Sequence, residues 1–295
     1  LVLLLFPFYY YGSAMKTKNA MQLKAMIKRV SIQKKISPQL AMQNYMLERI
    51  LARLEKSEFQ KNFIIKGGFL IGSMVGIDSR TTMDLDTTIT GFSLTHEILR
   101  ETFEKICKIE VDDDMQFSIE SISDIREGDD YPGLRISLKA NYEKMSVPLT
   151  IDVTTGDIIT PAAVVSGIPT MFDEGIIKVY SYNLETILAE KIETIISRAE
   201  ANTRPRDFYD IYLLTRLRMD DCDATILKIA LKRTSEKRGS IDAIRQWESV
   251  IPKIESSEFL RDNWMKYCNT NAVAEGISYE QTCESLKKLM ELVTE

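Results

Sequence analysis

The chain has 295 residues, 44% of them hydrophobic, which is enough to bury the core of one large domain or two smaller ones. Its formal net charge of −5 argues against nonspecific coating of nucleic acid but does not forbid a local basic surface. The single histidine, His96, excludes Ser-His-Asp, Cys-His and histidine-ligated metal schemes unless it serves alone. The scattered cysteines indicate neither a zinc site nor a disulfide framework, so we expect a cytoplasmic protein.

Residues 1–14 form an apolar run that is too short to span a bilayer and is interrupted by Pro7. We interpret this run as a leader or an added upstream segment, with the native sequence beginning at Met15. A signal peptide is the alternative interpretation, because Gly12-Ser13-Ala14 resembles a cleavage site.

Two helices are predicted next, over residues 18–30 and 37–54, from apolar residues at helical spacing. Ser37 is the expected N-cap of the second helix, and Pro38 lies in its first turn. Two clusters of basic residues, one on an N-terminal and one on a C-terminal helix, fit either nucleic-acid binding or an ordinary solvated helix face. They consist of Lys16, Lys18, Lys24, Lys28, Arg29, Lys34 and Lys35, and of Lys228, Lys232, Arg233, Lys237, Arg238 and Arg245.

Residues 66–89, KGGFLIGSMVGIDSRTTMDLDTTI, predict a glycine turn, a short helix, a loop and an acidic strand. Gly67 and Gly68 follow an apolar run, and such a turn lets backbone N–H groups approach a bulky anion such as phosphate. The strand period of two places Asp84 and Asp86 on one face. Because neighbouring carboxylates repel each other, the pair indicates either a bound cation such as Mg²⁺ or the wet face of an edge strand.

The following elements are a helix over 94–107, a strand over 115–122, a turn over 128–133 and a hairpin made by 134–139 and 147–153. One more strand is predicted at 176–180. Beyond it the pattern is helical, with helices near 184–199, 206–218, 222–233, 240–249, 257–268 and 279–293. We therefore expect an α+β fold, with a mixed-sheet domain over 15–181 and an all-helical domain over 182–295.

Four further charged residues are candidates for chemistry. Asp152 is a lone acid on a predicted strand, so it is either solvated or the third carboxylate of a metal cluster. Lys191 lies in the apolar stripe of its helix, where its amine must reach solvent or meet an anion such as phosphate, and Lys191→Met is expected to fold at least as well as the native chain. Asp207 and Asp210 share a helix face. At least one is expected within reach of Lys191, to orient its amine or to act as base for an acceptor hydroxyl, and Asp210→Asn is expected to leave the melting temperature almost unchanged.

These segments together resemble the AbiEii/AbiGii (MenT-like) nucleotidyltransferase toxins of bacterial type IV toxin–antitoxin systems. The resemblance covers about residues 60–215 and rests on K-G-G at 66–68, R-T-T-M-D-L-D at 80–86, I-D-V with G-D at 151–157, L-E-T-I-L-A-E-K at 184–191 and R-P-R-D-F-Y-D at 204–210. The sequence departs from many nucleotidyltransferases, which carry G-S directly at the glycine turn, because here Gly72-Ser73 lies further along the chain. Whether Ser73 or the backbone of Gly67 and Gly68 holds the phosphates is open at this point.

The resemblance implies a polymerase-β-like domain that uses an NTP and Mg²⁺, expected as two ions. It implies metal ligation by Asp84, Asp86 and Asp152, nucleotide binding by Gly67, Gly68, Ser73, Arg80, Thr82 and Lys191, and catalytic roles for Asp84, Asp86, Lys191, Asp207 and Asp210. The implied acceptor is the 3′ end of tRNA, whose modification would block translation and arrest growth in phage abortive infection. The implied partner is a cognate AbiEi-like antitoxin, and a monomer without membrane association is expected.

Three alternatives stay open. A small-molecule acceptor such as an aminoglycoside would use the same metal chemistry, although the basic helices favour RNA. A kinase-like enzyme would use the same lysine and carboxylates on a γ-phosphate, and a non-catalytic protein would bind NTP without turnover. The sequence names neither the nucleotide nor the RNA, because the shape of the pocket decides which base and acceptor are selected.

Overall fold

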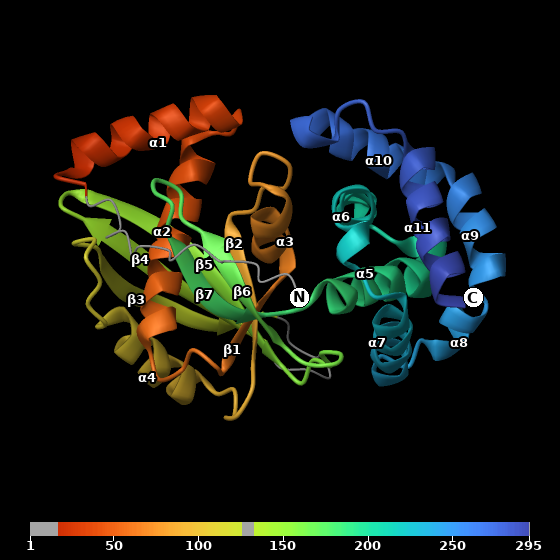
Figure 1. The fold of residues 1–295 in the computed structure, drawn as a ribbon, viewed down its shortest axis with the longest axis horizontal. Helices are drawn as coiled ribbons and strands as arrows, with labels where there is room; N and C mark the ends of the chain where they lie inside the picture. Colours follow the sequence, from red (N-terminus) through yellow and green to blue (C-terminus); the bar gives the residue numbers. More distant parts are fainter. Residues whose placement is uncertain (1–16, 126–132, 295) are drawn as a thin grey trace, which may run out of the picture.

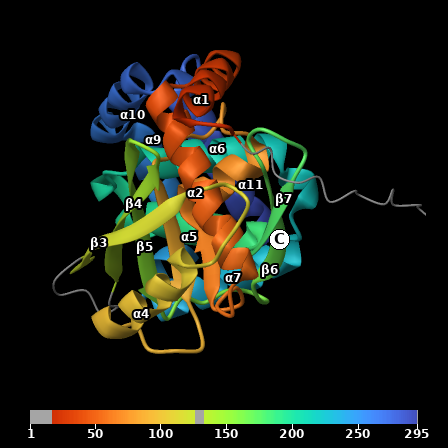
Figure 2. The same cartoon turned by 90° about the vertical axis from the view of Figure 1, so that its left-hand side faces the viewer.

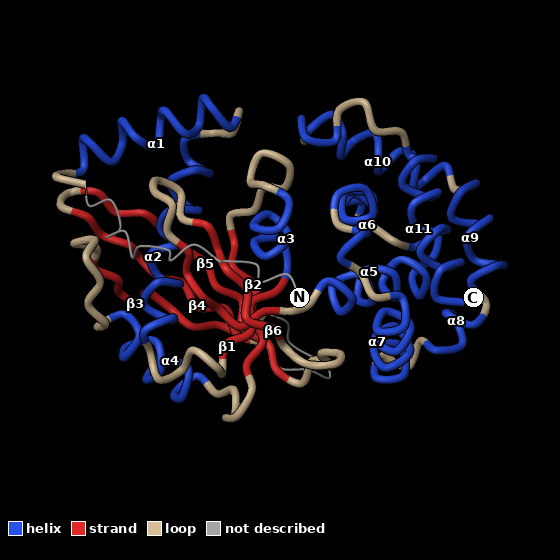
Figure 3. The backbone as a smooth tube through the Cα atoms, viewed as in Figure 1, coloured by secondary structure: helices blue, strands red, loops and turns tan. Residues whose placement is uncertain are grey.

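The computed structural model describes residues 17–125 and 133–294. The segment interpreted as a leader, and all but the last residue of the turn expected at 128–133, lie outside these ranges. No helix of the described ranges combines the length and the apolar character needed to cross a membrane. The described chain has the α+β fold that the sequence predicts, with a sheet in the first part and only helices after it (Figure 1, Figure 3).

Within the described ranges one mixed sheet of seven strands has the order β3-β4-β5-β2-β1-β7-β6. Strand β2 lies between β1, to which it is antiparallel, and β5, to which it is parallel, and β1 is parallel to β7. The strands are β1 (Phe63–Lys66), β2 (Asp84–Ile89), β3 (Gln116–Asp124), β4 (Leu134–Tyr142), β5 (Met145–Thr155), β6 (Val164–Pro169) and β7 (Ile176–Ser181).

The helices of the first part are α1 (Ala20–Lys34), α2 (Pro38–Lys56), α3 (Gly67–Val75) and α4 (His96–Cys107). As predicted, the Ser37 side chain caps α2 by accepting the Leu40 N–H, and Pro38 opens the helix. Helix α2 packs against β5 and β7 across the middle of the sheet, and α4 packs on β3 (Figure 2). Helix α3 begins directly after β1 and packs against β1 and β2.

The core lies between the sheet and helices α2 and α4. Alternation along the strands turns Phe63, Ile65, Leu85 and Ile151 toward these helices, and all four are almost completely buried. At about 25 cal/mol per Å² of apolar surface removed from water, burying each such side chain contributes roughly 1.5–3 kcal/mol. The opposite face of the same strands is therefore left for polar side chains.

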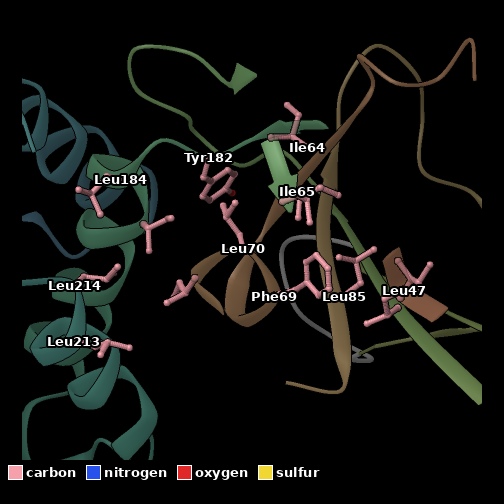
Figure 4. Packing of buried hydrophobic residues seen from close by; sticks show 14 of the residues in the cluster. Leu47, Ile64, Ile65, Phe69, Leu70, Leu85, Tyr182, Leu184, Leu213 and Leu214 are labelled. Carbon is pink, nitrogen blue, oxygen red and sulfur yellow. The ribbon is translucent and has the colours of Figure 1, made fainter. Parts of the chain in front are cut away.

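The second part of the chain is helical. Its helices are α5 (Leu184–Arg198), α6 (Pro205–Leu217), α7 (Ala224–Lys237), α8 (Ile241–Arg245), α9 (Trp247–Ser256), α10 (Glu258–Thr270) and α11 (Tyr279–Thr294). Apolar side chains continue from the sheet through Leu70 and Tyr182 to Leu184 and Leu214, so the two parts share one core cluster (Figure 4).

Two elements differ from the sequence prediction. Strand β6 was not predicted, because Gly167 and Pro169 interrupt its apolar pattern; it pairs with β7 at the edge of the sheet. The helix expected over 240–249 is broken at Gln246, which has a non-helical ψ of 17° and ends α8 before α9 begins.

Candidate active site

A row of four charged side chains crosses the polar face of the sheet. Lys66 of β1 is paired with Asp86 of β2, Asp86 with Asp152 of β5, and Asp152 with Arg135 of β4. The register therefore gives the charge order positive, negative, negative, positive across adjacent strands. Asp84 lies two residues before Asp86 on the same face of β2, as the alternation predicts.

The turn between β1 and α3 holds Asp86 closely. Gly67 has a φ of 68°, and a Cβ atom built on it would lie 2.0 Å from Oδ2 of Asp86, so only glycine fits there. The backbone N–H of Gly68 donates to the Asp86 carboxylate. The start of α3 thus contacts the acidic strand directly, and its first backbone N–H groups lie beside Asp86.

The two strand carboxylates are held at an electrostatic cost. Burial, and then the negative charge of Asp152, raise the pKa of both Asp84 and Asp86 above the ordinary value for aspartate. A divalent cation beside these carboxylates would relieve that repulsion, and oxygen donors are the ligands that Mg²⁺ prefers. The donor set therefore fits the metal that the sequence predicts.

Asp152 is engaged by a different cation. Arg135 donates from Nε and Nη2 to its two carboxylate oxygens, each at 2.8 Å. In the part of the chain that the structure describes, no group of three acidic, histidine or cysteine side chains is arranged to hold a metal ion. Both oxygens of Asp152 are engaged by Arg135, so ligation by Asp152 beside Asp84 and Asp86 requires this ion pair to open and stays a prediction.

Lys66 belongs to a second network. Its ammonium donates to Thr154 Oγ1 at 2.8 Å and forms an ion pair with Asp157, whose Oδ2 also accepts from the Tyr182 hydroxyl at 2.8 Å. Burial disfavours the charged form of Asp157, but Lys66 outweighs it and holds the pKa of Asp157 below its ordinary value. This network fixes Lys66 beside Asp86.

Lys191 and the acids of α6 meet as the sequence predicts. The Lys191 ammonium lies 2.7 Å from Asp207 Oδ1 and 2.7 Å from Asp210 Oδ2. Asp210 is completely buried and also accepts from Arg80 Nε at 2.5 Å. Burial disfavours a charged amine, but the two acids outweigh it and raise the pKa of Lys191. Because an ammonium has three donors, one N–H of Lys191 is left for another partner.

The two acids of α6 differ in their remaining capacity. Burial opposes ionisation of Asp210, yet Lys191 and Arg80 lower its pKa, so it stays a carboxylate with both oxygens engaged. Asp207 is also buried, but its Oδ2 has no hydrogen-bond partner and lies 3.5 Å from Arg204 Nε. Of the two, only Asp207 keeps an oxygen without a hydrogen bond, and that oxygen is buried beside Arg204, so a ligand reaches it only if the Arg204 side chain moves.

A cavity of about 400 Å³ brings several of these groups together, although Asp84 and Asp210 are not in its lining. It lies between the polar sheet face and helices α5, α6 and α7, and its lining includes Asp86, Asp152, Lys191 and Asp207. Among its described lining residues, basic and acidic side chains are present in equal numbers. A polyphosphate would therefore gain little net attraction from the protein alone, whereas one accompanied by a divalent cation would be better matched.

Several sequence candidates lie elsewhere. Ser73 and Thr82 line a different cavity, and Arg80 reaches Asp210 from the loop between them. The cavity wall also includes residues that the sequence did not single out for a role: Lys66, Asp157, Glu190 and Arg204. Their position follows from strand register and helix packing, although all four fall within the motifs quoted above.

The basic C-terminal cluster is only partly free. Arg238 donates to Glu193 at 2.6 Å and to Glu190 at 2.9 Å, and so ties α7 to α5. Lys237, from the same cluster, lines the cavity. This cluster therefore serves the packing of α5 and α7 in part.

Comparisons with known proteins agree with this geometry. The family described as "Nucleotidyl transferase AbiEii toxin, Type IV TA system" matches residues 49–277. The crystal structure of JHP933 from Helicobacter pylori is similar in fold, with a TM-score of 0.52 and 15% identity over 87% of this chain and 92% of that one. A second H. pylori structure, solved as that of a candidate nucleotidyltransferase, has a TM-score of 0.50 and 14% identity over 88% of this chain and 96% of that one. A search of curated proteins found no match.

Proposed function

Because this chain belongs to the AbiEii family of nucleotidyltransferase toxins of type IV toxin–antitoxin systems, we propose that it transfers a nucleotide from an NTP to the 3′ end of an RNA, with tRNA as the expected acceptor. The observation that carries this proposal is the placement of Asp86 and Asp152 beside the Gly67 turn, in one cavity with Lys191. Acidic strand, glycine turn and lysine are the three parts that nucleotidyl transfer requires: metal ligands, a phosphate cradle and positive charge.

Asp84 and Asp86 would hold Mg²⁺, and Asp152 would join them once Arg135 leaves it. The bound cation would supply a lowered pKa for the attacking hydroxyl and charge compensation for the leaving pyrophosphate. These ligand assignments rest on the preference of Mg²⁺ for carboxylate oxygens and on the repulsion among the three aspartates.

The protein's own groups would position the substrates. The backbone N–H groups at the start of α3 would approach the phosphates, as the left-handed Gly67 permits. Lys66 and Lys191, both fixed by carboxylates, would add positive charge on two sides of the cavity. Asp207 would accept the proton or hydrogen bond of the acceptor hydroxyl through Oδ2 once the exposed Arg204 side chain swings away from it. Asp210 would act as a positioning residue that orients Lys191 and Arg80.

In the cell, such a transfer would block aminoacylation of the modified tRNA and arrest growth, in keeping with a toxin of phage abortive infection. The partner implied by family membership is an antitoxin, and the proposed site of action is the cytoplasm.

The experiment is transfer with the purified protein, total tRNA, Mg²⁺ and each α-³²P-labelled NTP in turn. We expect one or two of the four nucleotides to label RNA of tRNA size, which identifies donor and acceptor together. Pyrophosphate release without labelled RNA would point to a small-molecule acceptor, and NTP binding without Mg²⁺-dependent pyrophosphate release would leave only a binding protein.

A further inference from the structure

A second cavity, of about 310 Å³, lies on the other side of α3 from the active-site cavity. Gly67 and Ile71 of α3 line the active-site cavity, whereas Phe69, Gly72 and Ser73 line the second one. With 3.6 residues per turn, these two sets occupy opposite faces of the helix. Helix α3 is therefore the wall that separates the two cavities.

The second cavity borders the acidic strand. Thr82 lines it, and Thr82 Oγ1 lies 3.5 Å from the backbone nitrogen of Asp84. Asp86, two residues further along β2, lines the active-site cavity. Asp84 lines neither cavity but lies between Thr82 and Asp86 in the chain, so the second cavity reaches the end of the strand that carries the proposed metal ligands.

The walls of the second cavity are mainly apolar, and besides Arg80, which is paired with Asp210, two buried polar side chains lie among them. Val30, Phe69 and Met171 are among the apolar lining residues, and Glu48 and Asn44 are only 4% and 7% exposed. Such a composition, apolar walls with a few placed polar groups, is typical of a small-molecule pocket.

The two polar side chains both offer acceptors. The Glu48 carboxylate accepts from Arg49 and, at 2.8 Å, from the Met171 backbone N–H, which leaves it further lone pairs. Asn44 donates from its Nδ2 to the backbone oxygens of Leu40 and Thr82, at 3.0 and 2.9 Å, so its amide oxygen is what it can offer a ligand. Because Arg80 is paired with Asp210 and Lys34 with Asp78, the acceptors of Glu48 and Asn44 favour a flat apolar ligand that carries hydrogen-bond donors.

One lysine, Lys34, lies at the edge of this cavity. Lys34 lines it and pairs with Asp78 at 3.3 Å. Helix α1 also exposes Lys24 and Lys28, Lys35 follows as its C-cap, and the helix runs along the upper edge of the molecule in Figure 1. Lys34 at the cavity edge, with further exposed lysines on the same segment, suits the phosphates of a nucleic-acid strand that leads into the cavity.

We propose that the second cavity binds the 3′-terminal nucleobase of the acceptor RNA and selects a base with an exocyclic amino group, which Glu48 and Asn44 accept. The terminal ribose would then reach Asp84, while the NTP occupies the cavity on the other side of α3. This proposal rests on the proposed function for its acceptor, but it concerns binding and can be tested without transfer.

The test measures binding of two 5′-fluorescein-labelled RNA pentamers by fluorescence anisotropy, without NTP or divalent metal. One pentamer ends in adenosine and the other in purine riboside, which has the same ring without the amino group. Above pH 7, where Glu48 is ionised, a hydrogen bond to a charged group distinguishes the two RNAs, so the native protein should bind the adenosine-ended RNA about tenfold more tightly. Equal affinity for the two RNAs, or no binding of either, would overturn the proposal.

Two variants locate the effect. Ser73→Phe places a ring in the second cavity and should abolish the preference for the amino group, with NTP binding retained. Met74→Phe, one residue along α3 and outside the lining of both cavities, is the matched control and should keep the preference. A preference that survives in Ser73→Phe, with both variants folded by thermal melting, would also overturn the proposal. A native preference without any nucleotidyl transfer would instead support the cavity assignment and count against the proposed function alone.

Discussion

Gly67→Ala should abolish nucleotidyl transfer, because the added methyl group collides with Asp86. A Cβ atom at this position would lie 2.0 Å from Oδ2, 2.7 Å from Cγ and 2.8 Å from Cβ of Asp86. Rotation of the carboxylate relieves only the first contact, so strand β2 or the turn itself must shift. The φ of 68° is a further cost, since an L residue in this conformation loses about 1–2 kcal/mol.

The free energy of unfolding should fall by about 2–5 kcal/mol, the sum of the left-handed backbone and an overpacking cost of about 1–3 kcal/mol. Gly239→Ala is the matched control, because Gly239 has a φ of 67° and nothing within 4 Å of the added atom. It should lose about 1–2 kcal/mol and keep its activity. Urea unfolding and incorporation of α-labelled nucleotide measure both effects. Native activity in Gly67→Ala, or equal destabilisation of the two variants, would refute this reasoning.

Three substitutions test individual charges. Asp210→Asn removes a buried acid from between Arg80 and Lys191 and should destabilise the fold by about 3–5 kcal/mol. The sequence alone leads to the opposite expectation, an almost unchanged melting temperature. An unchanged melting temperature would contradict the buried pairing. Burial raises the pKa of Glu48 from 4.5 to about 7, so its contribution to stability is complete below pH 4.5 and is lost as the pH rises through 7. Compared with Glu48→Gln, the native protein should therefore lose roughly 3 kcal/mol over this window in thermal melts, and a pH-independent difference would argue against it. Arg135→Gln frees Asp152 and should strengthen Mn²⁺ binding several-fold, as measured by calorimetry. Lys139→Gln is the control, because Lys139 lies on the same strand and its side chain is equally exposed at 47%, and it should leave Mn²⁺ affinity unchanged. Equal effects of the two substitutions would exclude competition between Arg135 and the metal at Asp152.

Local periodicity was enough to predict most of the elements and which side chains share a face. Asp84 and Asp86 lie together on β2, and Lys191 meets Asp207 and Asp210, because each relation depends on spacing within one strand or between two consecutive helices. The position of Ser73 also follows from helix phase, since six residues after Gly67 a helix has turned well away from the first face.

Relations that depend on pairing between distant strands could not be predicted. Arg135 meets Asp152 only through the β4–β5 register, and Lys66 meets Asp157 only because β1 and β5 lie on either side of β2. Tertiary pairing likewise changes the expectation for Lys191→Met. The anions that the buried amine needs are two aspartates, so the substitution leaves them uncompensated and should destabilise the fold.

The central claim is nucleotidyl transfer that depends on Asp86, and the fate of a phosphate label tests it most directly. The native protein and Asp86→Ala are each given acceptor RNA, Mg²⁺ and one NTP, labelled at either the α or the γ phosphate. The native protein should transfer the α label to RNA and release the γ label as pyrophosphate. Asp86→Ala should fold normally and transfer neither label, because it lacks a carboxylate proposed to hold the cation. Transfer of the γ label by the native protein, or transfer of the α label by Asp86→Ala at the native rate, would contradict this assignment of the site.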